Sequence, residues 1–165
     1  MKNKLVSKVW MLTLVMVVLV VSSGCGSKAA SAADLPLFPG AVELKPGEDP
    51  IADTLAKNME QDASLRQNIG VGGKIEQKVY RLPADGTWDA VKAFYDKELG
   101  AAGWKAGMGG IGGDIANQAL ESMNQSNEMI KTTMWSKGKQ VFTIFRLMDA
   151  PDATQAYLII SLNSN

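Results

Sequence analysis

Hydrophobic and polar positions divide the chain into two unlike parts. Residues 9–21 form a largely apolar run with no charge and one hydroxyl, Thr13, preceded by three lysines and followed by the small residues Ser22, Ser23 and Gly24. This run is shorter than the roughly 20 apolar residues that a permanent membrane span requires. The basic start, the short apolar core and the small residues are typical of a signal peptide. We therefore expect residues 1–24 to be cleaved, and an uncleaved membrane anchor is the less favoured alternative.

Beyond this segment the hydrophobic positions become periodic, and the clearest period is helical. Residues 87–102 place Trp88 and Leu99 on one apolar stripe and direct the charged side chains elsewhere. Such a stripe predicts a helix that buries one side against a core. The same spacing of three to four residues predicts further helices over residues 51–66 and 114–127.

The other hydrophobic segments alternate with polar residues or are rich in β-branched residues, which predicts strands. They are residues 74–82, 128–135, 140–148 and 154–162, with a very short strand around Trp104. Glycine between the second and third of these segments indicates a hairpin turn, and consecutive hairpins produce an antiparallel sheet. We expect an α+β fold in which an antiparallel β-meander of about four to five strands packs against one main helix, 87–102, with additional helices.

The expected organisation is a signal peptide over 1–24, a flexible tether over 25–34 and a single α+β domain over 35–165. Residues 25–34 consist mainly of alanine, glycine and serine, a composition typical of flexible linkers. The remainder is long enough to form one ordinary domain with its own core. On this view the tether holds the domain away from the bilayer.

The stretch Val21-Ser22-Ser23-Gly24-Cys25 resembles the lipobox of bacterial lipoproteins, although Ser22 stands where that family most often has leucine. In that family the cysteine thiol is alkylated by a diacylglycerol, and a peptidase then cuts just before it. The resemblance implies that Cys25 is the lipidation site and that the protein attaches to the membrane through an N-terminal lipid. The alternative is an unmodified cysteine beside an ordinary signal peptide.

The residue after the cysteine bears on the expected location. Gly26 stands where an aspartate retains many lipoproteins in the inner membrane. The resemblance therefore implies the outer membrane, facing the periplasm, where the source has two membranes. In a source with one membrane it implies the outer face of the cytoplasmic membrane.

A second resemblance covers residues 35–162. The segments 36–41, PLFPGA, and 94–104, FYDKELGAAGW, resemble a pattern found in small bacterial lipoproteins and secreted proteins of unknown function. In these proteins a PxYPGA-like opening precedes a strand, an FYxxxLxxxGW helix and a C-terminal β-meander; here Phe38 replaces the tyrosine. The motifs are structural, so the resemblance implies a fold and no catalytic residues.

The charge balance argues against polyanionic partners. The whole chain has 17 basic and 17 acidic side chains, and three of the basic ones precede residue 9. The exported part is therefore mildly acidic and contains no basic run. We expect no nucleic-acid binding, and the sequence lacks the polybasic stretch that attaches many proteins to anionic lipid.

The residue types exclude several kinds of active site. The chain has no histidine and one cysteine, so nucleophile–histidine systems and the usual zinc and haem ligand sets are absent. A single cysteine also excludes an internal disulfide. We expect no cofactor, no metal and no catalytic residues.

Residues 107–112, GMGGIG, fit the G-x-G-x-x-G pattern, but they follow a poor strand and precede an expected antiparallel hairpin. Because a dinucleotide site needs a parallel βαβ unit, we interpret these residues as a flexible glycine loop. The acidic residues near turns are interpreted as turn and capping residues that face solvent, and a weak calcium site is the alternative. They are Glu48, Asp49, Asp53, Asp149 and Asp152.

The aromatic side chains are numerous for a small domain, and we expect them to pack in the core. Core filling is also the favoured interpretation of Met123, Met129 and Met134, and an adaptable binding surface is the alternative. The functional expectation is a lipid-anchored, non-catalytic interaction or accessory domain of the cell envelope, whose partner is another envelope protein. The alternatives are a carrier of a small apolar ligand, with its pocket between the helices and the sheet, and a histidine-free hydrolase.

Overall fold

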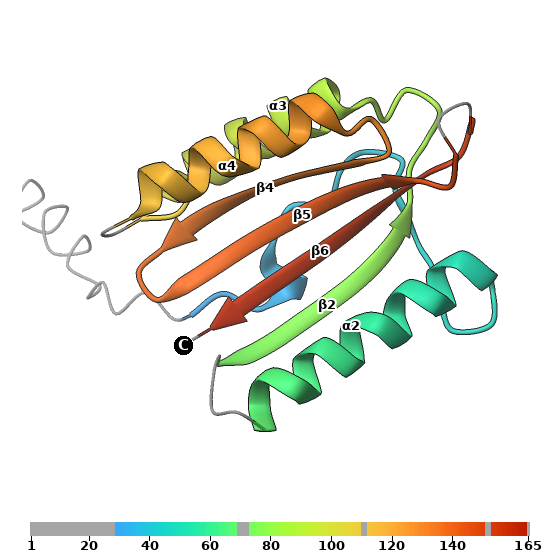
Figure 1. Cartoon of the computed structure of the whole chain (residues 1–165), viewed down its shortest axis with the longest axis horizontal. Helices are drawn as coiled ribbons and strands as arrows, with labels where there is room; N and C mark the ends of the chain where they lie inside the picture. Colours follow the sequence, from blue (N-terminus) through green and yellow to red (C-terminus); the bar gives the residue numbers. More distant parts are fainter. Residues whose placement is uncertain (1–28, 69–72, 110–111, 151–152, 165) are drawn as a thin grey trace, which may run out of the picture.

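The computed structural model describes residues 29–68, 73–109, 112–150 and 153–164. These residues form a six-stranded antiparallel sheet with helices on both faces and along one edge, which confirms the α+β fold (Figure 1). The helical elements are the 3₁₀ turn η1 (Ala32–Asp34), α2 (Pro50–Asn68), α3 (Trp88–Ala101) and α4 (Gly113–Ser126). The strands are β1 (Val42–Glu43), β2 (Lys74–Arg81), β3 (Lys105–Ala106), β4 (Ile130–Lys137), β5 (Gln140–Met148) and β6 (Ala156–Ser164).

The sheet is more than a simple meander, because its strand order is β1-β2-β6-β5-β4-β3. β4, β5 and β6 follow one another as hairpins, as the sequence predicts. β2, however, pairs antiparallel with β6 along its whole length, from Lys74 opposite Ser164 to Arg81 opposite Tyr157. β6 is thereby a central strand, and its residues 156–160 are all buried.

Helix α3 packs on one face of the sheet and forms the main core. Thr87 caps its start, since the Thr87 hydroxyl accepts a hydrogen bond from the Ala90 N–H. The predicted stripe is confirmed at Val91, Tyr95 and Leu99, which have no exposed surface. Their main partners on the sheet and beside it are large aromatic and aliphatic side chains: Trp104, Trp135, Phe142, Ile144, Leu158, Ile160 and Leu162.

Helix α2 covers part of the opposite face. Successive residues of a strand point to opposite sides, so Val79 and Ile159 face away from α3 while Tyr80 and Leu158 face toward it. Val79 and Ile159 pack with Ala52 of α2 in a second, smaller cluster. Figure 1 shows α2 lying along β2, which leaves β5 and much of β6 uncovered on this side.

Helix α4 runs along the edge of the sheet beside β4. Beyond the short pairing with β3 at Trp135 and Ser136, the outer side of β4 has no strand partner among the described residues. The Asn124 side chain takes that place: the Thr132 N–H donates to Asn124 Oδ1 at 2.8 Å, and Asn124 Nδ2 donates to the Thr132 carbonyl at 2.7 Å. The helix therefore covers an edge that would otherwise present open backbone groups.

The second half of the expected tether is folded onto the domain. Residues 32–34 form η1, Ala32 is buried, and Ala30 exchanges hydrogen bonds with the Gln140 side chain. The segment available as a linker therefore ends before Ala30. The expected signal peptide and Cys25 lie outside the described residues. None of the helices in the described part of the chain combines the length and the hydrophobicity that a bilayer crossing needs.

Candidate functional site

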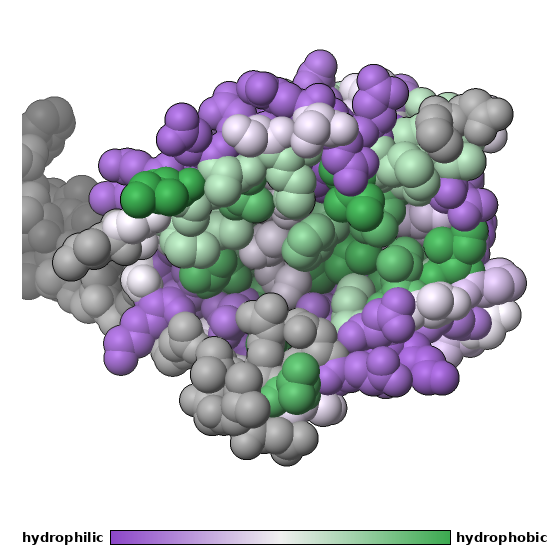
Figure 2. All heavy atoms as spheres, viewed as in Figure 1, coloured by the Kyte–Doolittle hydropathy of each residue, from purple (hydrophilic) through white to green (hydrophobic). Residues whose placement is uncertain are grey.

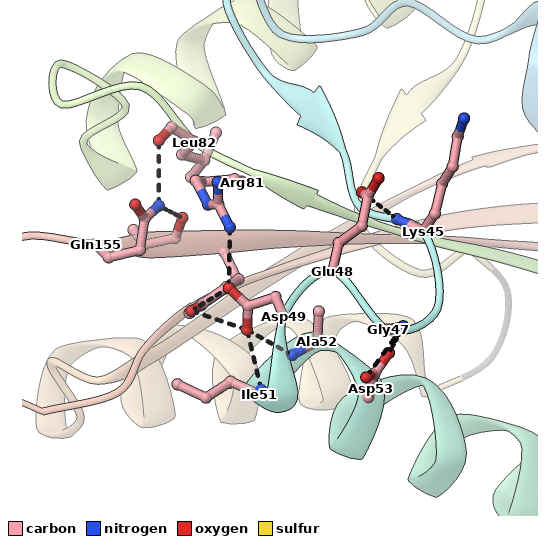
Figure 3. A network of polar contacts seen from close by, with 12 residues as sticks. Lys45, Gly47, Glu48, Asp49, Ile51, Ala52, Asp53, Arg81, Leu82 and Gln155 are labelled. Atoms are coloured by element: carbon pink, nitrogen blue, oxygen red, sulfur yellow. Dashed lines mark hydrogen bonds and ion pairs between the residues drawn. The ribbon is translucent and has the colours of Figure 1, made fainter.

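The acidic cluster before α2 is a capping structure. Asp49 Oδ1 accepts hydrogen bonds from the N–H groups of Ile51 and Ala52, at 2.9 and 3.2 Å, so Asp49 caps the helix that Pro50 begins. Its other oxygen accepts a hydrogen bond from Arg81 at 3.1 Å and one from the Tyr157 hydroxyl at 3.1 Å. Figure 3 shows these groups converging on one carboxylate at the start of α2.

The expectation that these carboxylates face solvent is wrong for Asp49, which is only 8% exposed. Burial raises the pKa of the Asp49 carboxyl, but the hydrogen bonds from Ala52, Arg81, Tyr157 and Ile51 outweigh burial and hold that pKa below its ordinary value. Burial, followed by the bond to Asp49, raises the pKa of the Tyr157 hydroxyl. Asp49 is therefore ionised at neutral pH, and its hydrogen bonds hold α2 against β2 and β6.

The neighbouring carboxylates are also occupied by backbone groups. Glu48 accepts the Lys45 N–H at 2.9 Å, and Asp53 accepts the Gly47 N–H at 2.9 Å (Figure 3). In the described ranges, no group of three or more acidic or cysteine side chains is arranged to hold a metal ion. Of the second acidic pair that the sequence singles out, Asp149 is exposed and Asp152 lies outside the described residues.

The glycine loop does not have the surroundings of a dinucleotide site. The strand before it, β3, has only two residues, and all described strand pairs are antiparallel. Gly107 donates its N–H to the Met134 carbonyl at 2.8 Å, and Gly112 adopts φ +86° just before α4. Residues 110 and 111 lie outside the described part.

The aromatic side chains are mostly core residues, as expected. Tyr95, Trp135 and Phe142 contact one another with ring centroids 5.5 to 6.0 Å apart, and each is almost fully buried. Trp135 also donates its indole N–H to Asp96 at 3.1 Å. Trp88 differs from them: it is half-buried at the start of α3 and borders a pocket.

That pocket lies between α3, α4 and β4 and has a volume of about 610 Å³. Its apolar lining includes Trp88 and Leu120. Lys92 and Lys131 supply two ammonium groups, of which Lys92 contacts Asp96 at 2.6 Å and Lys131 donates to the Asn124 carbonyl. The lining is mixed, with polar amides and Glu121 beside the apolar side chains, so the pocket suits a ligand with both polar and apolar parts.

The uncovered part of the sheet on the α2 side is the second candidate site. The apolar residues of β4 and β5 that point to this side are half-buried or exposed, and we refer to them together with Ala119 and Met123 of α4 as the open face. They are Ile130, Met134, Val141, Phe145 and Leu147. Figure 2 shows hydrophobic residues gathered over the strands on this side, between hydrophilic margins above and below.

Helix α4 extends this surface. Its side toward the pocket carries Asn117, Glu121 and Asn124, while Ala119 and Met123 lie about half a turn away. Met123 is 40% exposed, and Ile130 at the start of β4 is 38% exposed. The interpretation of Met123 as a core residue is therefore wrong, because the core-facing positions of α4 are taken by the residues that seal the sheet edge.

The sequence signals located these sites only in part. The methionine group did contain open-face residues. A pocket does lie between α3, α4 and β4, but its lining is mixed, whereas the sequence suggested an apolar pocket between the helices and the sheet. Lys92 and Lys131 were not singled out, because their proximity depends on how α3 and β4 pack. Comparisons of the chain with protein-family models, with curated proteins and with solved structures give no match in any of the three.

Proposed function

We propose that the chain is a lipid-anchored protein of the cell envelope, attached through acyl chains at Cys25, whose folded part is a non-catalytic interaction domain. The open face carries this proposal. It exposes Ile130 and Met123 and leaves the other large apolar side chains half-buried. Apolar surfaces bordered by polar residues are typical of protein–protein contact sites. Its occupant is a second envelope protein that presents a complementary apolar surface.

The state of the carboxylates supports a non-catalytic role. A general acid or base needs an accessible group that can take up or release a proton near neutral pH. Asp49, Glu48 and Asp53 are instead engaged by backbone N–H groups, and the sequence contains no histidine to replace them. Methionine on the open face suits binding, because its unbranched side chain adapts to the shape of a partner.

A site-specific photo-cross-linker in intact cells tests the interaction. We expect a cross-linker at Met123 to produce a reproducible adduct with one envelope protein, and a cross-linker at Ala93, exposed on α3, to produce none. The substitution Ile130→Glu is expected to abolish the Met123 adduct, because it places a charge in the apolar contact. Ala93→Glu is the matched control and should leave the adduct unchanged. Identical adducts from both positions, or an adduct that survives Ile130→Glu, would exclude the open face as the contact site.

The anchor is tested separately. We expect Cys25→Ser to move the protein from the membrane fraction to the soluble fraction, or to leave it with an uncut signal peptide. Mass spectrometry of the wild-type protein should show an N-terminus at Cys25 that carries acyl chains. Membrane attachment of Cys25→Ser with a normally cut N-terminus would contradict the lipid anchor.

A ligand carrier is the second candidate function, and the pocket beside Trp88 favours it. Because Trp88 and Leu120 supply apolar surface and Lys92 and Lys131 supply ammonium groups, the pocket suits a small amphipathic anion. Native mass spectrometry of gently purified protein should then show a bound species of constant mass. Leu120→Trp is expected to fill the pocket and remove this species. Wild-type protein that consistently carries nothing would exclude the carrier.

A further inference from the structure

The N-terminal segment is fixed to one end of the sheet. The Ala30 N–H donates to Gln140 Oε1 at 3.0 Å, and Gln140 Nε2 donates to the Ala30 carbonyl at 2.7 Å. Gln140 is buried and also donates to the Ser164 hydroxyl at 2.8 Å. Two residues further on, the Ala32 N–H donates to Glu76 at 3.0 Å. The chain therefore joins the domain where β4 and β6 end and β5 and β2 begin, which we refer to as the anchor-side end.

The proposed lipid anchor limits how far this end can lie from the bilayer, and the inference rests on that anchor. A chain spans at most about 3.6 Å per residue, so an acylated Cys25 lies within about 18 Å of Ala30. β5 has nine residues and is about 30 Å long at the rise of an antiparallel strand. The opposite end of the sheet therefore lies beyond the reach of the anchor.

We propose that the anchor-side end faces the bilayer and that its lysines contact anionic lipid headgroups. Lysines that are far apart in the sequence meet at this end. Lys105 pairs opposite Ser136, Lys137 pairs opposite Gln140, and Lys139 lies in the exposed hairpin turn between β4 and β5. Lys74 pairs opposite Ser164 in the same region.

Two acidic side chains at this end, Glu76 and Asp34, are engaged by neighbouring groups. Glu76 contacts Lys74 at 2.8 Å and accepts the Ala32 N–H, while Asp34 accepts hydrogen bonds from Ser31. Asp114 lies in the first turn of α4. The opposite end carries Asp85, Asp89, Glu128 and Asp149, all exposed. The cations of the opposite end are engaged, since Arg81 pairs with Asp49, Lys131 donates to the Asn124 carbonyl and Arg146 donates to the Gly86 carbonyl. The exposed lysines Lys105 and Lys139 lie at the end where the anchor enters.

An exposed apolar side chain lies at the same end. Ile115, in the first turn of α4, is 76% exposed, the highest value among the large hydrophobic residues that are described as exposed. The start of α4 is placed there by the glycine loop, in which Gly109 approaches the Ser136 hydroxyl. An isoleucine beside lysines suits the boundary between headgroups and acyl chains. With this end on the bilayer, the strands stand upright and the open face points sideways, accessible to a neighbouring protein.

Fluorescence quenching on vesicles tests the orientation. The full-length protein, expressed in its acylated form, is reconstituted into vesicles of phosphatidylethanolamine and phosphatidylglycerol that contain a headgroup-labelled quencher. Because Cys25 is acylated, an introduced cysteine is the only free thiol for an environment-sensitive dye. Lys139→Cys labels the anchor-side end, and Ala84→Cys, also in an exposed turn, labels the opposite end. We expect the dye at 139 to lose most of its fluorescence and the dye at 84 to lose little.

The charge contact is tested in the same assay. Replacing phosphatidylglycerol by phosphatidylcholine, raising the salt concentration, or adding Lys105→Gln should each weaken quenching at 139, since headgroup attraction is screened by salt. Equal quenching at 139 and 84, or stronger quenching at 84, would overturn the orientation in a protein whose acylation is confirmed by mass. If quenching of the dye at position 139 does not depend on the lipid charge, the proposed contact between the lysines and the headgroups would be overturned. A protein that carries no acyl chains would overturn the anchor, and the inference with it.

Discussion

The Asn124 side chain acts toward Thr132 as a neighbouring strand would. Its amide donates to the Thr132 carbonyl and accepts the Thr132 N–H, with both bonds at 2.8 Å or shorter. Two further side chains support this arrangement: Lys131 donates to the Asn124 carbonyl, and Asn127 accepts the N–H groups of Met129 and Ile130. α4 is therefore attached to the edge of the sheet mainly by polar contacts, and its apolar residues remain available for other surfaces.

Asn124→Ala should loosen α4 from the sheet. The substitution leaves the Thr132 N–H and carbonyl without their partner, so we expect a loss of about 1–3 kcal/mol in the free energy of unfolding. Denaturant unfolding measures this loss, and hydrogen exchange should show faster exchange at Thr132. Gln125→Ala, at an exposed neighbouring position, is the control and should change the stability by less than about 0.5 kcal/mol. Equal stability of the two variants would show that the amide bridge contributes nothing.

Asp49→Ala should destabilise the domain more than the loss of a cap alone. An N-cap contributes about 1 kcal/mol, and Asp49 additionally bonds to Arg81 and Tyr157. We expect a total loss of about 2–3 kcal/mol in the free energy of unfolding, with the Arg81–Asp49 pair contributing little because Arg81 is partly exposed. Asp49→Asn, which retains a capping oxygen, should recover about half of the loss. Urea denaturation of the two variants measures both values.

The free energy of unfolding of the domain should depend on pH through Asp49. The folded-state pKa of Asp49 lies below the ordinary value of 3.8, so its ionised form is favoured in the folded protein. Its stabilising effect is therefore complete at pH values above 3.8 and is lost as the pH falls through the lower folded-state pKa. The free energy of unfolding of the wild type should fall more steeply than that of Asp49→Asn below pH 4. Parallel pH profiles of the two proteins would contradict this assignment.

A hydrophobic residue in the core and one exposed on α4 should respond differently to truncation. Leu99 has no exposed surface, so Leu99→Ala should cost about 2–5 kcal/mol. Ile115 is 76% exposed, and Ile115→Ala should change the stability by less than about 0.5 kcal/mol. Thermal and denaturant unfolding measure both. A large loss for Ile115→Ala would mean that this side chain serves the fold instead of an external surface.

The sequence predicted most local elements because their signals are local. The stripe on α3, the Gly138 hairpin and the strand segments all appear within a few residues of their predicted limits. η1 and β1 were missed, since two or three residues carry no period. The pairing of β2 with β6 was also missed, because it joins residues as distant as Gln77 and Ser161, which are 84 positions apart.

The candidate sites were predictable only as residue types. Composition indicated surplus methionine and no catalytic histidine, and both features bear on the proposed interaction domain. The position of Met123 on the solvent side of α4 follows from the Asn124 bridge, which no hydrophobic pattern reveals. The meeting of Lys105 and Lys139 at one end likewise depends on strand register, so a search for a basic run in the sequence could not find it.

The central position of β6 has a consequence for how the chain reaches its native state. Every other described element precedes β6, yet β2 on one side and β5 on the other both require it as their partner. Until β6 is available, β2 lacks its long partner and β5 has only β4, so the sheet cannot close. Such distant pairing slows folding and leaves apolar strands open to aggregation. For the exported protein proposed above, we therefore expect folding to follow export, with a chaperone protecting the apolar strands until β6 arrives.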